Sequence, residues 1–138
     1  MSSLKEKILC EIDNIDKVIE NIKNAKPMKD LNNLEVMGIS ALIQNFYSGI
    51  ENILKQIFNE YNYIIPNNPT WHKSLLTDSV KYHILSESIS LKLNNYLGFR
   101  HFFIHGYGYN IKKEFLKPLV DDIFYIYEDF KKEISKYL

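Results

Sequence analysis

Apolar residues recur at intervals of three and four along most of the chain, which is the spacing of a helix face. The first stripe predicts an amphipathic helix over roughly residues 3–25. It ends at Lys26 because a residue before proline is pushed out of the helical region, and Pro27 follows. Cys10 lies on the apolar side of this helix, so we expect it to be a small core residue. The stripe consists of Leu4, Ile8, Ile12, Ile15, Ile19 and Ile22.

The second stripe predicts a longer helix, from about Asp30 to about Tyr61. At 1.5 Å per residue it is about 45 Å long. Gly38 and Gly49 weaken it slightly but allow another helix to approach closely. Its apolar positions are Leu34, Ile39, Leu42, Phe46, Ile50, Ile53, Ile57 and Tyr61.

A loop and a short helix follow. Residues 62–70 hold two prolines and three asparagines, which is typical of a loop. Thr70 is a candidate N-cap for a short helix over residues 71–80, anchored by Trp71, Leu75 and Val80. His72, beside the tryptophan, is interpreted as structural, with stacking on RNA as the lesser alternative.

Two further helices complete the chain. One covers about 84–104 and stops at Gly106 and Gly108. The other covers about 112–137, and Pro118 falls in its early turns, so the regular helix either starts there or kinks there. The inward positions predicted for this last helix are Phe115, Leu119, Ile123, Phe124, Tyr127, Phe130 and Ile134.

The pattern therefore predicts an all-α fold, a helical bundle of four main helices plus one short helix, in up-down-up-down order. Its 138 residues suit a single domain over 1–138, with five glycines, four prolines and no strand-period segment. A single cysteine excludes an intramolecular disulfide. Charged residues recur near the N-terminus and no window approaches the roughly 18 apolar residues of a membrane span, so we expect a cytoplasmic protein.

Positive charge is concentrated in one segment although the chain is neutral. Residues 92–117 carry five basic residues against one acidic residue, a net charge of +4, and the rest carries twelve against sixteen, a net charge of −4. Such a patch attracts anionic ligands, although the lysines are equally consistent with a solvated helix face. Arg100 lies inside it and is the only arginine, against sixteen lysines.

Arg100 and His105 together suit RNA cleavage without a metal. On a continuous helix five residues separate the two side chains by about 140°, so they share a site only if the helix loosens near the glycines. A histidine can take the proton of a ribose 2′-hydroxyl or protonate the leaving 5′-oxygen, and arginine binds phosphate through a planar fork. The alternative is structural, with both residues capping carbonyls or pairing with a carboxylate. His101 and His105 have the i, i+4 spacing of metal ligands, but no third ligand is evident, so we predict neither a metal nor a cofactor.

The stretch FRHFFIHGYGYNI resembles the signature of HepT-like ribonuclease toxins of the HEPN superfamily. Arg100, His101, His105 and Tyr107 fill its positions in register. NFYSGIENILKQIF at 45–58 resembles the family's second-helix segment, and the helix that begins at Trp71 resembles its short Trp-His-x-x-Leu-Leu helix.

The resemblance implies a homodimer whose two motifs face one RNA-cleaving cleft. Arg100 would hold the scissile phosphate, His105 would be the general acid or base, and His101 would assist. Tyr107 matches a tyrosine to which a cognate antitoxin, an MNT-type nucleotidyltransferase, adds AMP. Relatives often carry a basic residue at the position of Ile104.

Two lysines near the motif are candidates for binding the RNA backbone. Either the missing basic residue weakens RNA binding, or Lys112 and Lys113, which follow the motif directly, compensate for it. The alternative function is a non-enzymatic HEPN partner subunit that binds a nucleotidyltransferase or a nucleotide. An internal salt bridge at Arg100 and a buried His105 would favour that alternative.

Overall fold

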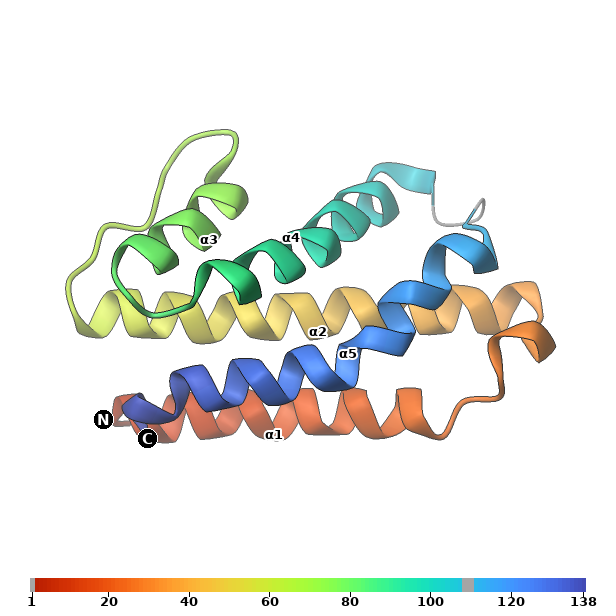
Figure 1. The fold of residues 1–138 in the computed structure, drawn as a ribbon, viewed down its shortest axis with the longest axis horizontal. Coiled ribbons are helices and arrows are strands. Elements are labelled where there is room, and N and C mark those ends of the chain that lie inside the picture. Colours follow the sequence, from red (N-terminus) through yellow and green to blue (C-terminus); the bar gives the residue numbers. More distant parts are fainter. Residues whose placement is uncertain (1, 108–110) are drawn as a thin grey trace.

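The protein folds into five α-helices within residues 2–107 and 111–138, which are the residues that the computed structural model describes, with Gly106 and Tyr107 described by their backbone alone (Figure 1). A π-helical turn, η2 (Phe103–Tyr107), continues α4. Of the two 3₁₀ turns, η1 (Met28–Asp30) precedes α2 and η4 (Ser135–Tyr137) follows α5. The described residues contain no strand, so the predicted all-α class is confirmed. The helices are α1 (Leu4–Lys23), α2 (Asn33–Glu60), α3 (Trp71–Lys81), α4 (Glu87–Phe102) and α5 (Lys113–Ile134).

The long helices alternate in direction, as Figure 1 shows. Helices α1 and α2 lie side by side and antiparallel, and α5 returns along α1, so that both termini lie at one end of the molecule. The short helix α3 and α4 cover another side of α2. Helix α4 leads away from the termini, so the segment with Arg100 lies at the opposite end.

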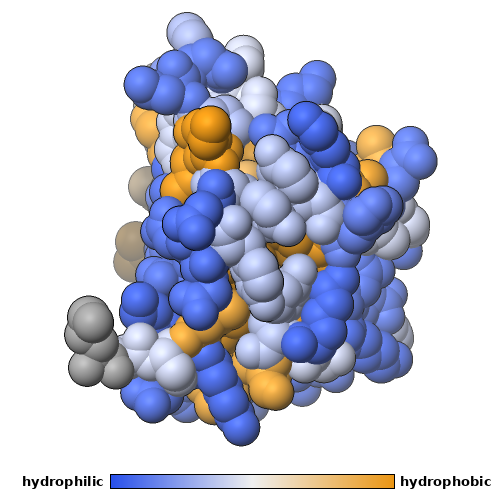
Figure 2. Space-filling view, turned by 90° about the vertical axis from the view of Figure 1, so that its left-hand side faces the viewer, coloured by the Kyte–Doolittle hydropathy of each residue, from blue (hydrophilic) through white to orange (hydrophobic). Residues whose placement is uncertain are grey.

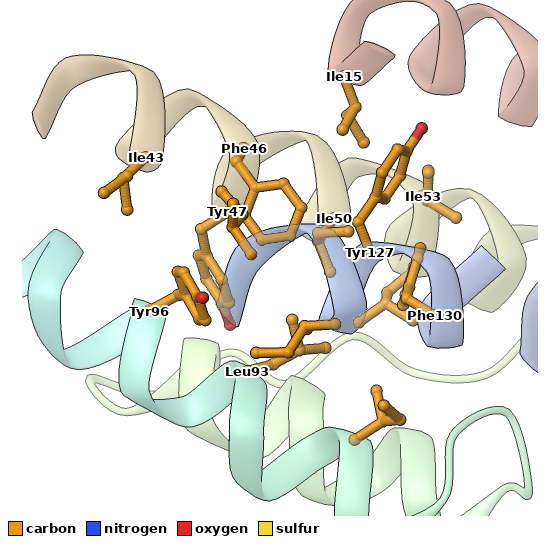
Figure 3. Close-up of a cluster of buried hydrophobic side chains, with 14 of the residues drawn as sticks. Ile15, Ile43, Phe46, Tyr47, Ile50, Ile53, Leu93, Tyr96, Tyr127 and Phe130 are labelled. Atoms are coloured by element: carbon orange, nitrogen blue, oxygen red, sulfur yellow. The ribbon is translucent and has the colours of Figure 1, made fainter. Parts of the chain in front are cut away.

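Helix α2 is the centre of the core. Thirteen of its 28 residues are buried, which is more than one amphipathic stripe provides. Phe46 illustrates the packing, because its ring meets Tyr96 of α4 and Tyr127 of α5 edge-to-face at centroid distances of 5.4 Å and 6.0 Å (Figure 3). Helices from both sides therefore pack against the same turn of α2.

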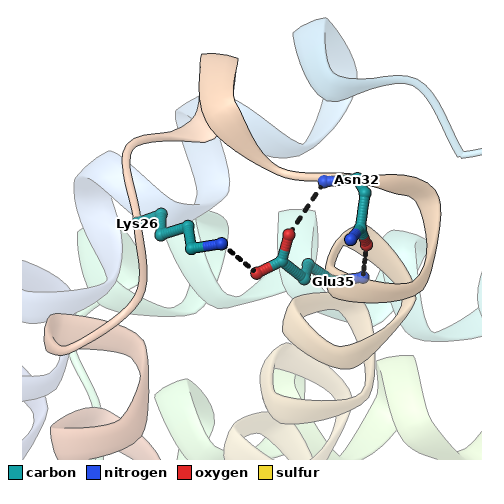
Figure 4. A network of polar contacts seen from close by, with 3 residues as sticks. All are labelled: Lys26, Asn32 and Glu35. Carbon is teal, nitrogen blue, oxygen red and sulfur yellow. Dashed lines mark hydrogen bonds and ion pairs between the residues drawn. The ribbon is translucent and has the colours of Figure 1, made fainter.

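The N-terminus of α2 is fixed by a capping box (Figure 4). The backbone N–H of Glu35 donates to Asn32 Oδ1 at 2.8 Å, and the backbone N–H of Asn32 donates to Glu35 Oε1 at 3.0 Å. Lys26 Nζ lies 3.2 Å from the other Glu35 carboxylate oxygen. These bonds place the start of α2 at Asn33 rather than at the predicted Asp30, which belongs to the 3₁₀ turn.

Several predicted positions differ from the structure. Cys10 is exposed, because the buried side of α1 follows the isoleucines and leaves Cys10 outside it. Leu34 and Phe115 are 78% and 56% exposed, since each lies on the outer side of its helix, and the nearby Val36 and Leu116 are buried in their place. Thr70 occupies the N-cap position of α3 but makes no capping bond, because its hydroxyl is within hydrogen-bond distance of Asn68 Oδ1. Helix α5 begins at Lys113 and continues through Pro118.

The end of the bundle that holds the termini is covered by aromatic rings. Tyr63 stacks on Tyr82 with ring centroids 4.0 Å apart, and Tyr61 meets both Tyr63 and Tyr137. Figure 2 faces this end, where side chains of intermediate hydropathy fill the centre and hydrophilic ones surround them. In the described part of the chain, no helix is long and apolar enough to cross a membrane.

The two glycines of α2 allow a matched test of helix packing. A Cβ at Gly49 would lie 2.6 Å from Ile15 Cγ1, whereas a Cβ at Gly38 would meet nothing within 4 Å. Ile15 is buried, so its side chain can give way only by displacing its neighbours in the core. We expect Gly49→Ala to lower the free energy of unfolding by about 1 kcal/mol or more. Gly38→Ala should raise it by up to about 1 kcal/mol, and urea denaturation of both variants checks this. Equal effects would contradict the close contact between α1 and α2.

The capping box predicts an acid-dependent contribution to stability. The backbone bond from Asn32, followed by the bond from Lys26, lowers the pKa of Glu35. Because this pKa is lowered on folding, the charge stabilises the protein above the ordinary glutamate pKa, and the stabilisation is lost as the pH falls through the folded value. We expect Glu35→Gln to be less stable than the wild type at pH 7 and equally stable near pH 3. Glu60→Gln, at the other end of α2, is the control and should not give this acid-dependent difference.

Candidate functional site

Helix α4 ends in an irregular turn. After Phe102 the chain continues as the π-helical turn Phe103–Tyr107, in place of the glycine-terminated α-helix that we expected. A π-turn pairs residues five apart and takes more residues per turn than an α-helix, so it narrows the angle between Arg100 and His105 below about 140°. Such turns are rare and occur often at functional sites.

The structure brings His101 and His105 together. Their ring centroids are 4.2 Å apart and the ring planes are tilted by 51°. Both side chains are exposed, one from the last turn of α4 and one from the π-turn. Two imidazoles in contact at the surface can donate and accept protons for one bound substrate.

Arg100 does not join this pair directly. Its side chain is half-buried, and its Nε is buried with no hydrogen-bond partner among the described residues. In the same part of the chain no carboxylate lies within ion-pair distance of its guanidinium, and no hydrogen bond links it to His105. A partly buried guanidinium without an anion is costly, which makes it a strong site for a phosphate.

Tyr47 of α2 carries a second buried polar atom that lacks a hydrogen-bond partner among the described residues. Its ring extends from α2 toward α4 (Figure 3), and its hydroxyl is buried with no hydrogen-bond partner among the described residues. Burial raises the pKa of Tyr47 strongly, and the Glu51 carboxylate raises it further, both through its negative charge and because it is placed to accept from the hydroxyl. The positive charge of Arg100 acts in the opposite direction, which places the guanidinium within electrostatic range of the hydroxyl.

A carboxylate–imidazole contact joins α2 to α3 one turn beyond Tyr47. Glu51 is only 3% exposed, and its Oε2 is 2.6 Å from Nδ1 of His72 at the start of α3. The His72 ring stacks on Trp71 at 3.6 Å, and Lys55 Nζ lies 4.3 Å from the centre of the Trp71 ring. His72 thus has the structural contact that its position beside the tryptophan suggested.

Glu51 was missed by the sequence analysis, although a signal was present. On α2 it falls between Tyr47 and Leu54, inside a row of buried positions spaced by three and four residues. A carboxylate inside an apolar row is rarely buried without a partner. His72 provides that partner from another helix, and this pairing depends on the tertiary structure.

The remaining predicted site residues lie around the π-turn. Lys112 is exposed at the N-cap of α5. Lys113 is half-buried, and its Nζ donates to the backbone carbonyl of Lys29 at 3.3 Å, so it is partly committed to the fold. The backbone of Tyr107 ends the π-turn, whereas its side chain lies outside what the structure describes.

A groove runs between α4 and α5 beside the histidines. It has a volume of about 900 Å³, and His101 forms part of its wall. The Phe115 ring packs against the rings of Phe99 and Phe102, at centroid distances of 6.3 Å and 5.9 Å, and still leaves much of its surface exposed. Tyr125 farther along α5 is 75% exposed. Apolar surface of this kind is typical of a site that another molecule covers.

No group of three or more histidine, cysteine or acidic side chains within the described ranges is arranged to hold a metal ion. His101 and His105 form a pair without a third ligand among these residues.

The helical bundle, with an arginine at the end of α4 and a histidine five residues later, agrees with the HEPN type that the sequence resembles. The family model described as "HepT-like protein" matches residues 38–138, which include α2 to α5 and the whole candidate site. The chain therefore belongs to the HepT-like family. Neither the curated proteins nor the solved structures contain a significant match.

The buried pair predicts a stability effect at α3. Replacing His72 by alanine leaves the Glu51 carboxylate buried without its partner, so we expect His72→Ala to lower the free energy of unfolding by about 2 kcal/mol. Lys73→Ala, at the next and exposed position of α3, is the matched control and should change stability by less than about 0.5 kcal/mol. Urea denaturation measures both. Equal stabilities of the two variants would show that the pair contributes nothing.

Proposed function

We propose that this protein is a metal-independent endoribonuclease, the toxin of a toxin–antitoxin pair. Its membership of the HepT-like family makes a ribonuclease the first candidate. One observation carries the proposal. Among the described residues Arg100 has no carboxylate partner, and His105 is exposed beside a second imidazole. If the two residues had only a structural role, we would expect a carboxylate beside the Arg100 guanidinium and the His105 ring packed in the protein interior.

The reaction uses the nucleophile that RNA itself contains. His105 takes the proton of the ribose 2′-hydroxyl, the 2′-oxygen attacks the adjacent phosphorus, and the bond from phosphorus to the 5′-oxygen breaks. The leaving 5′-oxygen receives a proton, so the products are a 2′,3′-cyclic phosphate and a 5′-hydroxyl. Arg100 holds the non-bridging oxygens and stabilises the charge that develops on them.

His101 assists His105. The ring contact of 4.2 Å keeps the two imidazoles at one phosphate, where His101 orients His105 or donates to a phosphate oxygen. Lys112, exposed at the start of α5, binds the RNA backbone, and Lys113 supports it close to the same surface. Their contribution is electrostatic and falls as the salt concentration rises.

The protein acts as a homodimer in this proposal. The groove between α4 and α5 borders the candidate site, and Ile104, Phe115 and Tyr125 near it are 48%, 56% and 75% exposed. A second copy that covers this surface brings two His101–His105 pairs to one cleft. The regulatory partner is an MNT-type nucleotidyltransferase antitoxin, which adds AMP to Tyr107 and thereby blocks the cleft.

Cleavage of bulk cellular RNA in EDTA tests the activity. We expect wild-type protein to leave 2′,3′-cyclic phosphate ends, and both Arg100→Ala and His105→Ala to reduce the rate at least about 100-fold, because each removes a group that acts in the transition state. Lys7→Ala, at an exposed position of α1 near the opposite end of the molecule, is the control and should retain most of the activity.

Circular dichroism, size-exclusion chromatography and mass spectrometry of Tyr107 accompany the assay. If the wild type is folded, dimeric and unmodified at Tyr107 but leaves RNA intact, the nuclease proposal is wrong. The protein is then a HEPN subunit that binds a nucleotidyltransferase or a nucleotide through the same surface.

A further inference from the structure

Two buried polar side-chain atoms belong to α2 and α4, which pack against each other. Tyr47 Oη and Arg100 Nε are both shielded from water, and both are without a hydrogen-bond partner in the described residues. One can accept a hydrogen bond that the other can donate. A buried polar atom without a partner is costly, so two such atoms on packed helices call for a common explanation.

Glu51 extends this arrangement on the other side of Tyr47. It follows Tyr47 by one turn of α2, which puts the two side chains on the same face of the helix. Its carboxylate is anchored by His72 at 2.6 Å and is 3% exposed. The donors and acceptors therefore match in order: the Nε–H can donate to the hydroxyl, the hydroxyl can donate to the carboxylate, and the imidazole holds the carboxylate.

We propose that Tyr47 and Glu51 are positioning residues that hold the Nε edge of Arg100 and so aim its two terminal nitrogens at the substrate phosphate. In this arrangement the Nε–H of Arg100 donates to Tyr47 Oη, so that each atom gains a partner that it otherwise lacks among the described residues. Glu51 fixes the direction of the tyrosine hydroxyl, and His72 fixes Glu51. The catalytic consequence rests on the proposed ribonuclease function, whereas the hydrogen bond itself does not.

This arrangement explains why the chain places its only arginine at position 100. A guanidinium has a separate Nε–H that can be held from behind while both terminal nitrogens bind phosphate in front. A lysine has a single nitrogen on a flexible stem and cannot be held at one atom while it binds through two others. The protein uses lysine for its other sixteen basic side chains, where charge alone is sufficient.

Nuclear magnetic resonance provides a direct test that needs no activity. Because the chain has one arginine, a proton–nitrogen spectrum of the guanidinium region contains a single Nε–H signal, which belongs to Arg100. We expect this signal to be protected from exchange with solvent in the wild type. Tyr47→Phe keeps the ring and removes the hydroxyl, so it should accelerate the exchange at least about tenfold and shift the resonance.

Tyr127→Phe is the matched control. It also removes a buried tyrosine hydroxyl, but that hydroxyl donates to Asp16 at 2.6 Å, at the contact between α5 and α1. It should lower stability without changing the exchange of the Arg100 signal. If Tyr47→Phe fails to fold, Glu51→Gln replaces it, and loss of the carboxylate charge should accelerate the exchange by a smaller factor.

The RNA assay separates this inference from the proposed function. We expect Tyr47→Phe to lower kcat about tenfold with little change in KM, because a poorly aimed guanidinium loses contacts that form in the transition state. Rapid exchange in the wild type, or the same exchange in Tyr47→Phe, would overturn the positioning role even if RNA is cleaved. Protected exchange that Tyr47→Phe abolishes, in a protein that leaves RNA intact, would support the hydrogen bond and refute the nuclease.

Discussion

The burial of α2 on several sides is the constraint on which the rest of the structure depends. A helix with one apolar stripe accepts one layer of neighbours, but α2 has buried residues around much of its circumference and therefore needs partners on more than one side. Helix α1 meets it at Gly49, where the absence of a side chain lets Ile15 approach. Helices α3, α4 and α5 cover its other faces. The order of the bundle follows from this demand.

The core also contains a row of polar side chains, Tyr47 and Glu51 of α2 and His72 of α3. Replacing the buried Glu51–His72 pair by apolar residues of the same volume would often be neutral for stability, so the pair is not explained by stability alone. It lies on the side of α2 that faces α3 and is continuous with Tyr47. Polar groups thereby continue through the core from α3 to Tyr47, and Arg100 on the neighbouring α4 has no carboxylate partner among the described residues.

The two parts of the candidate site differ in how they are held. Arg100 is half-buried against the rigid core, whereas His101 and His105 are exposed on the turn where α4 changes to a π-helix. A side chain that binds a phosphate binds more tightly when folding has already fixed its position, because it then loses little conformational entropy on binding. Groups that exchange protons need contact with the substrate and with solvent. The proposed roles therefore agree with the local structure of each residue.

The sequence by itself determined the helical class, the approximate limits of the five helices and the family signature around Arg100. The spacing of apolar residues and the positions of proline and asparagine encode these features, since helix formation depends on residues within a few turns of one another. It misplaced Cys10 and Phe115, because the apolar pattern does not show which residues at the edge of a stripe face inward. Which polar groups share a buried environment was decided only by the tertiary structure, since Tyr47, Glu51, His72 and Arg100 belong to three different helices. Their pairing depends on how those helices pack, which no local pattern specifies.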